Sequence, residues 1–391
     1  MPKPTASIIK GIAVLWLLLL LLPDLASPYL LPEATTKLRD QTPAVFHTKS
    51  GLYNRHDPPC HPAAGVNSRS RESQTGSVYG VGGVFGRRRR TVRMLEGTGT
   101  SGTAVVIEAS KGVPRGPEGA IKLTYLEINS WMWQVNGLNL LVDPLFGTLD
   151  FGFPALIRGT KRVIRDNARA IRELSAVTDC LVISQGIDDH CHPPTIGALA
   201  GLLDPSVRVI APPSAKGVLE KHFPASRITY LLPGESTVVS KDGRAVELRT
   251  TSGAVLGPPW QQAENGYIVR PAAADSGGKA PTGGSLYYEP HLMFDSSEVS
   301  ELQADVVIAP VVEQKIAAYT LVAGGEKALK LASALKASMI VPMPNAEADF
   351  AGPLGNVVTE ANTEQEFLEL ARKEGVKVVT AKAAERIDVW P

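Results

Sequence analysis

Apolar and polar positions begin to alternate at Ile121, and the alternation predicts three strands in succession. These strands are expected at residues 121–125, 130–135 and 138–142. The last two are joined by Asn136-Gly137, a dipeptide that favours a tight hairpin turn because both residues tolerate positive φ. Asp143-Pro144 then ends the third strand. We interpret Asp143 as a turn residue, with a role in chemistry as the alternative.

The next part of the chain alternates short apolar runs with helical patterns. We expect strands at residues 181–183 and 207–211, a helix at 196–203 capped by Thr195, and a helix at 214–221 capped by Ser214. Strands and helices that alternate at this spacing indicate βαβ units and parallel strands.

A second β-rich part follows from about residue 237. We expect a hairpin at 237–251 that turns at Asp242-Gly243, strands at 285–288, 305–310, 338–341 and 376–380, and helices at 326–335 and 363–373. Residues 272–284 are rich in Gly, Pro and Ser and predict a flexible loop.

The most informative polar segment runs from Ser184 to Thr195, directly after the apolar run 181–183. It holds two acids, two histidines and a thiol. Loops at the carboxyl ends of strands are where α/β proteins place ligands. Cys191 lies between two histidines, which could activate it as a nucleophile, but no orienting side chain can be assigned and a buried inert thiol is the expected state.

Composition and charge exclude few classes of function. The chain has 391 residues, is 44% hydrophobic and carries a formal net charge of +1, which gives no argument for nucleic acid or an anionic membrane surface as partner. The 3 cysteines, Cys60, Cys180 and Cys191, lack metal-finger spacing and predict no disulfide framework. The expected partner is a small molecule, and the sequence does not predict an oligomeric state.

The N-terminal third differs from the rest. Residues 1–36 form a signal-like targeting segment, with lysines before an apolar run at 11–23 that is short for a membrane span. Residues 37–119 are rich in Arg, Ser, Gly and Pro and predict a disordered, transit-peptide-like linker. The combination resembles the two-part presequence of algae with secondary plastids, so we predict import into a plastid (chloroplast), with secretion or an endomembrane location as alternatives. After processing, no stable membrane span is expected.

The polar loop resembles the metallo-β-lactamase superfamily, whose members carry Ser-His-x-His-x-Asp-His after a strand. Ser184, Asp189 and His190 match this pattern, whereas Gln185 and Ile187 stand in place of the first two histidines. The resemblance implies an α/β fold, a single-domain αββα metallo-β-lactamase sandwich over residues 120–391. The order of strands suggests the sugar-lactonase-like branch. Several short sequences resemble a plant and cyanobacterial subgroup: Gly257-Pro258-Pro259-Trp260, Glu264-Asn265-Gly266-Tyr267 and Tyr287-Tyr288-Glu289-Pro290-His291.

The same comparison implies that the dinuclear zinc site of the superfamily is lost. No histidine lies between His222 and His291, and Pro344 stands where relatives have their last histidine ligand. Four histidines in residues 120–391, at 190, 192, 222 and 291, are too few for the family pattern. His291 aligns with the aspartate that bridges the two ions in relatives.

Two interpretations of the remaining polar residues stay open. In the first, Asp189, His190 and His291 hold at most one ion, zinc or another divalent metal, with Asp189, His190 and Glu289 as catalytic residues and His192 as a supporting group or general base. In the second, these residues form a structural hydrogen-bonded network that fills the pocket in which relatives hold their metal ions.

The function that we predict first is a small-molecule-binding or non-classical hydrolase-like protein. The alternative is a mononuclear metallohydrolase of an ester, lactone or phosphoester, and the third hypothesis is a structural or interaction protein.

Overall fold

The computed structural model describes residues 121–255, 262–274, 282–316, 319–345, 347–353 and 358–389. The predicted targeting segment and linker, and the predicted motif at 257–260, lie outside these residues and stay predictions. In the part of the chain that the structure describes, no helix is long and apolar enough to cross a membrane.

The first of two large sheets has seven strands in the order β19-β1-β2-β3-β5-β6-β7. Its antiparallel half is β19, β1, β2 and β3, and β5, β6 and β7 continue from β3 in parallel. The bounds are β1 Ile121–Tyr125, β2 Trp131–Val135, β3 Leu138–Val142, β5 Cys180–Val182, β6 Arg208–Ala211, β7 Ile228–Tyr230 and β19 Arg386–Val389. The predicted hairpin turn is confirmed, since Asn136 and Gly137 have φ of 49° and 73°.

The second sheet also has seven strands, in the order β18-β15-β12-β11-β10-β9-β8. Here β8, β9, β10 and β11 are antiparallel, whereas β11, β12, β15 and β18 run parallel to one another. The bounds are β8 Ser236–Lys241, β9 Arg244–Ser252, β10 Asn265–Ala272, β11 Leu286–Tyr288, β12 Val306–Pro310, β15 Met339–Met343 and β18 Lys377–Val378. The predicted turn at Asp242-Gly243 is confirmed by the hairpin of β8 and β9.

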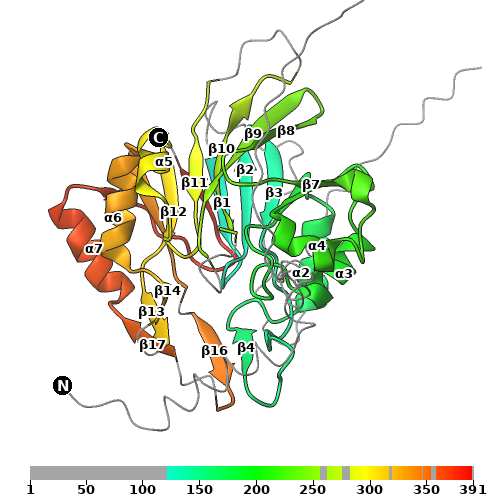
Figure 1. The fold of residues 1–391 in the computed structure, drawn as a ribbon, viewed down its shortest axis with the longest axis horizontal. Helices are drawn as coiled ribbons and strands as arrows, with labels where there is room; N and C mark the ends of the chain where they lie inside the picture. The colour runs from blue at the N-terminus through cyan, green and yellow to red at the C-terminus, as the bar shows by residue number, and fades with distance from the viewer. Residues whose placement is uncertain are drawn as a thin grey trace, which may run out of the picture. The chain divides into compact units, whose positions relative to one another are not determined.

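The two sheets pack face to face with helices outside both, so the predicted αββα sandwich is confirmed (Figure 1). The alternation within strands explains the layers. Trp131, Trp133 and Val135 of β2 point into the core between the sheets, whereas Met132 packs under the helices of the first sheet. Because both faces of each sheet are covered, the sequences of the strands are nearly continuous runs of apolar residues.

Helices cover the outer faces in two groups. The first sheet is covered by α2 Asn167–Ser175, α3 Pro193–Ala200 and α4 Lys216–Leu219, and the second by α5 Ser296–Ser300, α6 Gly325–Ala334 and α7 Glu364–Lys373. Short 3-10 helices lie at η1 Pro213–Ala215 and η2 Ala225–Arg227. Two small sheets are formed by β13 Glu313–Ile316 with β14 Tyr319–Val322 and β17 Val358–Ala361, and by β4 Arg158–Lys161 with β16 Ala348–Ala351.

Two predicted helix starts are wrong. The first helix begins at Pro193, after His192, because proline fits the first turn, where its missing N–H costs nothing. Thr195 instead bonds the backbone of Phe146. The second predicted helix is a 3-10 turn followed by α4, and the Ser214 hydroxyl donates to Glu264 rather than capping a helix. The helix predicted at 363–373 is confirmed as α7, with Thr363 as its N-cap, since the Thr363 side chain accepts from the Glu366 N–H.

Candidate functional site

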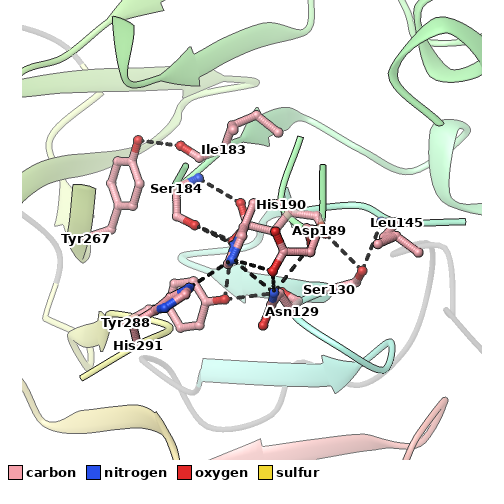
Figure 2. A network of polar contacts seen from close by, with 11 residues as sticks. Asn129, Ser130, Leu145, Ile183, Ser184, Asp189, His190, Tyr267, Tyr288 and His291 are labelled. Atoms are coloured by element: carbon pink, nitrogen blue, oxygen red, sulfur yellow. Dashed lines mark hydrogen bonds and ion pairs between the residues drawn. The ribbon is translucent and has the colours of Figure 1, made fainter. Parts of the chain in front are cut away.

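The site lies where several strands end at one edge of the sandwich. Asp143 follows β3, the segment Ser184–His190 follows β5, and Glu289 to His291 follow β11. β3 and β5 are parallel neighbours, so their carboxyl ends meet. The turn between β1 and β2 adds Asn129, and Figure 2 shows Asn129, Asp189 and His291 directed toward His190.

Asp143 is the acceptor at the base of this network. It is fully buried and has φ of 43°, a conformation that Asp tolerates better than most residues. Its Oδ1 accepts from the Ser184 N–H at 2.7 Å, and its Oδ2 accepts from the Ser184 hydroxyl and from Tyr288 at 3.3 Å. The same oxygen lies 2.9 Å from Nδ1 of His190. The sequence interpretation of Asp143 as a turn residue misses this contact.

His190 is therefore held in one orientation. Its Nδ1 faces the Asp143 carboxylate, which can only accept, so Nδ1 carries a hydrogen. Its Nε2 faces Asp189 Oδ2 at 3.3 Å. Although burial alone would lower the pKa of His190, the charges of Asp189 and Asp143 outweigh it and raise the pKa to about 10. Burial alone would raise the pKa of Asp189, but the charge of His190 holds it below its usual value.

His291 completes the cluster from the opposite sheet. Its Nδ1 donates to the carbonyl of Leu321 at 2.7 Å, so its Nε2 carries a lone pair when the ring is neutral. That lone pair points at Nε2 of His190, 3.3 Å away. Burial and the neighbouring His190 lower the pKa of His291 to about 4, so the ring is neutral at neutral pH.

The three predicted metal ligands are thus brought together. One ligand atom from each of Asp189, His190 and His291 lies within 4.8 Å of the other two. Asp189 also keeps a buried Oδ1 without a hydrogen-bond partner among the described residues. No sequence pattern pointed to Asn129, whose amide nitrogen lies 3.2 Å from Asp189 Oδ2 and 3.0 Å from His190 Nε2.

Glu289, the third predicted catalytic residue, lies beside the cluster rather than in it. Its Oε2 accepts from the Met293 N–H at 2.6 Å, and its Oε1 has no partner among the described residues. Burial raises the pKa of Glu289 to about 7. A carboxyl group with that pKa can exchange a proton at neutral pH. Glu264, to which the sequence analysis assigned no chemical role, has a pKa raised by burial to about 7 as well, and accepts from Ser214 at 2.7 Å.

Two further candidates have structural positions. The ring of His192 lies 2.8 Å from the Thr195 hydroxyl and 3.2 Å from the Thr148 carbonyl, so it ties the loop after β3 to the start of α3. Cys191 is fully buried, and burial raises the pKa of its thiol far above the usual value, which agrees with the expected inert thiol.

The positions that would hold a first metal in the family pattern offer no imidazole. Gln185 is fully buried, and neither its amide oxygen nor its amide nitrogen has a partner in the part of the chain that the structure describes. Pro344 presents a backbone carbonyl that accepts from Tyr125 at 3.0 Å. Among the described residues, the only group that could hold a metal is Asp189, His190 and His291.

Residues 122–344 match the family model described as the beta-lactamase superfamily domain. No curated protein matches the sequence.

Three solved structures illustrate what the chain is similar to. A metallo hydrolase from the archaeon Ignicoccus hospitalis is 16% identical, with a TM-score of 0.46, covering 70% of this chain and 99% of that chain. A possible metal-dependent hydrolase from Veillonella parvula is 13% identical, with a TM-score of 0.48, covering 70% and 100%. The isothiocyanate hydrolase from Delia radicum gut bacteria is 16% identical, with a TM-score of 0.48, covering 68% and 98%.

Proposed function

Because the chain belongs to the beta-lactamase superfamily, we propose that it is a hydrolase that uses a single divalent metal ion, held by Asp189, His190 and His291. The observation that carries this proposal is the convergence of three donor atoms from two sheets. When both rings are neutral, the Nε2 lone pairs of His190 and His291 and a carboxylate oxygen of Asp189 meet with no proton between them.

Two of the three spacings between these atoms match those of a small tetrahedral ion. Zinc binds imidazole nitrogen at about 2.0–2.1 Å, so two ligands of a tetrahedral site lie about 3.3–3.4 Å apart. The two Nε2 atoms are 3.3 Å apart, and Asp189 Oδ2 is 3.3 Å from His190 Nε2. Hydrogen bonds from the other ring nitrogens to Asp143 and to the Leu321 carbonyl are the outer support that metal-binding histidines ordinarily have.

A divalent ion at this place would supply Lewis acidity, which polarises the carbonyl group of an ester or lactone. The residues of the chain do the rest. Asp143 fixes the tautomer of His190, and the Leu321 carbonyl fixes that of His291. Glu289 takes a proton from the attacking water as the water oxygen bonds to the carbonyl carbon. It then returns the proton to the leaving oxygen as the ester bond breaks. A pKa of about 7 suits both steps.

A second candidate follows from the pKa of His190. With no ion present, a proton on Nε2 of His190 can bond to Asp189 or His291 and satisfy the same lone pairs, and its pKa of about 10 favours that state. This state corresponds to the non-catalytic polar network, in which the protein only binds its small molecule.

Hydrolysis by stripped and reloaded protein distinguishes the two. The purified full chain is treated with a chelator, reloaded with zinc, and assayed on p-nitrophenyl acetate and on δ-valerolactone. The proposal predicts activity that returns with one equivalent of zinc and that His190→Ala abolishes. His222→Ala, which removes an exposed histidine outside the cluster, is the matched control and keeps activity. Activity that survives stripping, or that His190→Ala retains, would refute the single-metal mechanism.

A further inference from the structure

We propose that the chain binds an uncharged, hydroxyl-bearing part of its substrate in a buried subsite lined by Gln185, Glu264 and Asn265, next to the donor cluster. In the family pattern, Gln185 stands where a metal-binding histidine belongs. That the ligand is a substrate rests on the proposed function, but binding at this subsite requires no metal.

The first observation is a set of buried polar atoms without partners. Both polar atoms of the Gln185 side chain, Oδ1 of Asn265 and Oε1 of Glu289 are buried and unpaired among the described residues. Gln185 and Asn265 are 0% exposed. Native proteins pair nearly all such atoms, because each unpaired one destabilises the fold. Gln185 and Asn265 lie on adjoining segments, so one bound polar group can pair with their unpaired atoms.

The second observation is that these residues lie on adjoining segments. The Asn265 N–H donates to the Ser184 carbonyl at 3.1 Å, directly before Gln185. Gly186, directly after Gln185, packs so closely on Ser214 that an added Cβ would lie 2.6 Å from the Ser214 hydroxyl oxygen. This hydroxyl donates to Glu264. Gln185 is therefore bracketed by two contacts with the segment that starts β10.

Two glycines let the backbone beside this segment approach Glu289 closely. A Cβ at Gly253 would lie 3.2 Å from Oε1 of Glu289, and a Cβ at Gly266 would lie 3.2 Å from its Cγ. Side chains at these two positions would crowd the Glu289 carboxyl group. The unpaired Oε1 therefore faces the 253–254 backbone, at the border between the donor cluster and the Gln185 subsite.

The chemistry of the unpaired atoms selects the ligand class. Gln185 offers both donors and an acceptor, whereas Asn265 offers an acceptor, because its amide nitrogen already donates to the Leu231 carbonyl at 2.9 Å. Hydroxyl groups suit such a set, since each one donates and accepts. Anions do not suit it. Glu264 and Glu289 border the subsite, and among the described residues no lysine or arginine contacts either carboxyl group.

The test starts with stability in the absence of ligand. Gln185→Leu replaces the unpaired amide with an apolar group of similar size. Because unpaired buried polar atoms destabilise the fold, we expect the melting temperature of the metal-stripped full chain to rise by about 2–4 °C. The matched control is Gln134→Leu, since the Gln134 amide donates to Asn139 at 2.9 Å, and this change should lower the melting temperature. A lower value for Gln185→Leu would overturn the inference, because the amide would then be satisfied in the free chain.

Ligand binding gives the second readout. The metal-stripped chain is titrated calorimetrically with erythritol and D-glucose, and with D-gluconate and D-glucose 6-phosphate as anionic counterparts. We expect at least one neutral polyol to bind, with affinity lost by tenfold or more in Gln185→Leu, and no binding of the two anions. Binding of the anions, or binding of no polyol, contradicts the inference. Since zinc is absent throughout, failure of the single-metal hydrolase would leave these results unchanged.

Discussion

Replacing Asp143 by Asn tests how the site holds His190. The substitution keeps the size of the side chain and the oxygen that accepts from the Ser184 N–H, but it places an amide N–H opposite Nδ1 of His190. Two donors then face each other, so the imidazole moves its hydrogen to Nε2, and the lone pair needed for a metal is lost. The same logic explains why an aspartate beside a catalytic histidine fixes its tautomer in serine proteases.

The magnitude follows from the geometry. The Asp143–His190 contact is 2.9 Å long and both side chains are 0% exposed, so it is a charge-assisted hydrogen bond shielded from water. Loss of such a bond costs about 1.5–3 kcal/mol of stability. Removing the outer partner of a metal-binding histidine raises the Kd for the ion by about 10–100-fold.

Two measurements check this prediction. Zinc affinity is measured by competition with a chromogenic chelator, and unfolding by urea is followed with and without a chelator. Asp179→Asn is the matched control, because Asp179 also accepts a backbone N–H, from Asn139 at 2.9 Å, but lies before β5 and bonds Lys241. It should lose stability without changing the Kd for zinc. An unchanged zinc Kd in Asp143→Asn would refute the role given to this residue.

Three further changes have defined outcomes. His190 keeps its proton up to about pH 10, and His291 is neutral above about pH 4, so uptake of one zinc ion releases one proton. The Kd for zinc should therefore fall about tenfold per pH unit between pH 6 and 8.5. A Kd that does not change with pH would contradict this. Asn129→Ala removes an amide that bonds the same lone pairs and should tighten zinc binding by about 3–10-fold, whereas weaker binding would show that the amide oxygen is a ligand. Burial lowers the pKa of Lys161 to about 7, so between pH 7 and the normal lysine pKa the unfolded chain binds one more proton than the folded chain. The unfolding free energy of the wild type relative to Lys161→Met should therefore rise by up to about 1.4 kcal/mol per pH unit. Urea unfolding at pH 7, 8 and 9 measures this. If the unfolding free energies of the two proteins changed in parallel with pH, the lowered pKa of Lys161 would be refuted.

Local signals predicted the parts of the fold that local chemistry determines. The hairpin of β2 and β3 could be placed to within a residue, because Asn136-Gly137 allows only a tight turn between two alternating runs. The helix after the polar loop begins three residues earlier than predicted, because Thr195 satisfies its hydroxyl on Phe146 instead of on the helix. Several short elements, such as β4 and β16, depend on pairing with distant strands and leave no periodic pattern.

The candidate site shows the same division. Asp189, His190 and His291 could be named from the resemblance of their sequence context to a known metal-binding pattern, and the structure brings them together. Asp143 lies 47 residues before His190, and only the parallel pairing of β3 with β5 makes them neighbours. Asn129 reaches the cluster from a turn in which Glu127 and Ile128 have positive φ, a conformation that their residue types do not predict.

Metal stoichiometry tests the central claim most directly. The full chain is equilibrated with zinc, freed of unbound ion, and its zinc is counted per chain by elemental analysis. The single-metal account predicts one ion per chain in the wild type and in His222→Ala, and none in His190→Ala. Two ions per chain in the wild type, or one ion retained by His190→Ala, would contradict it.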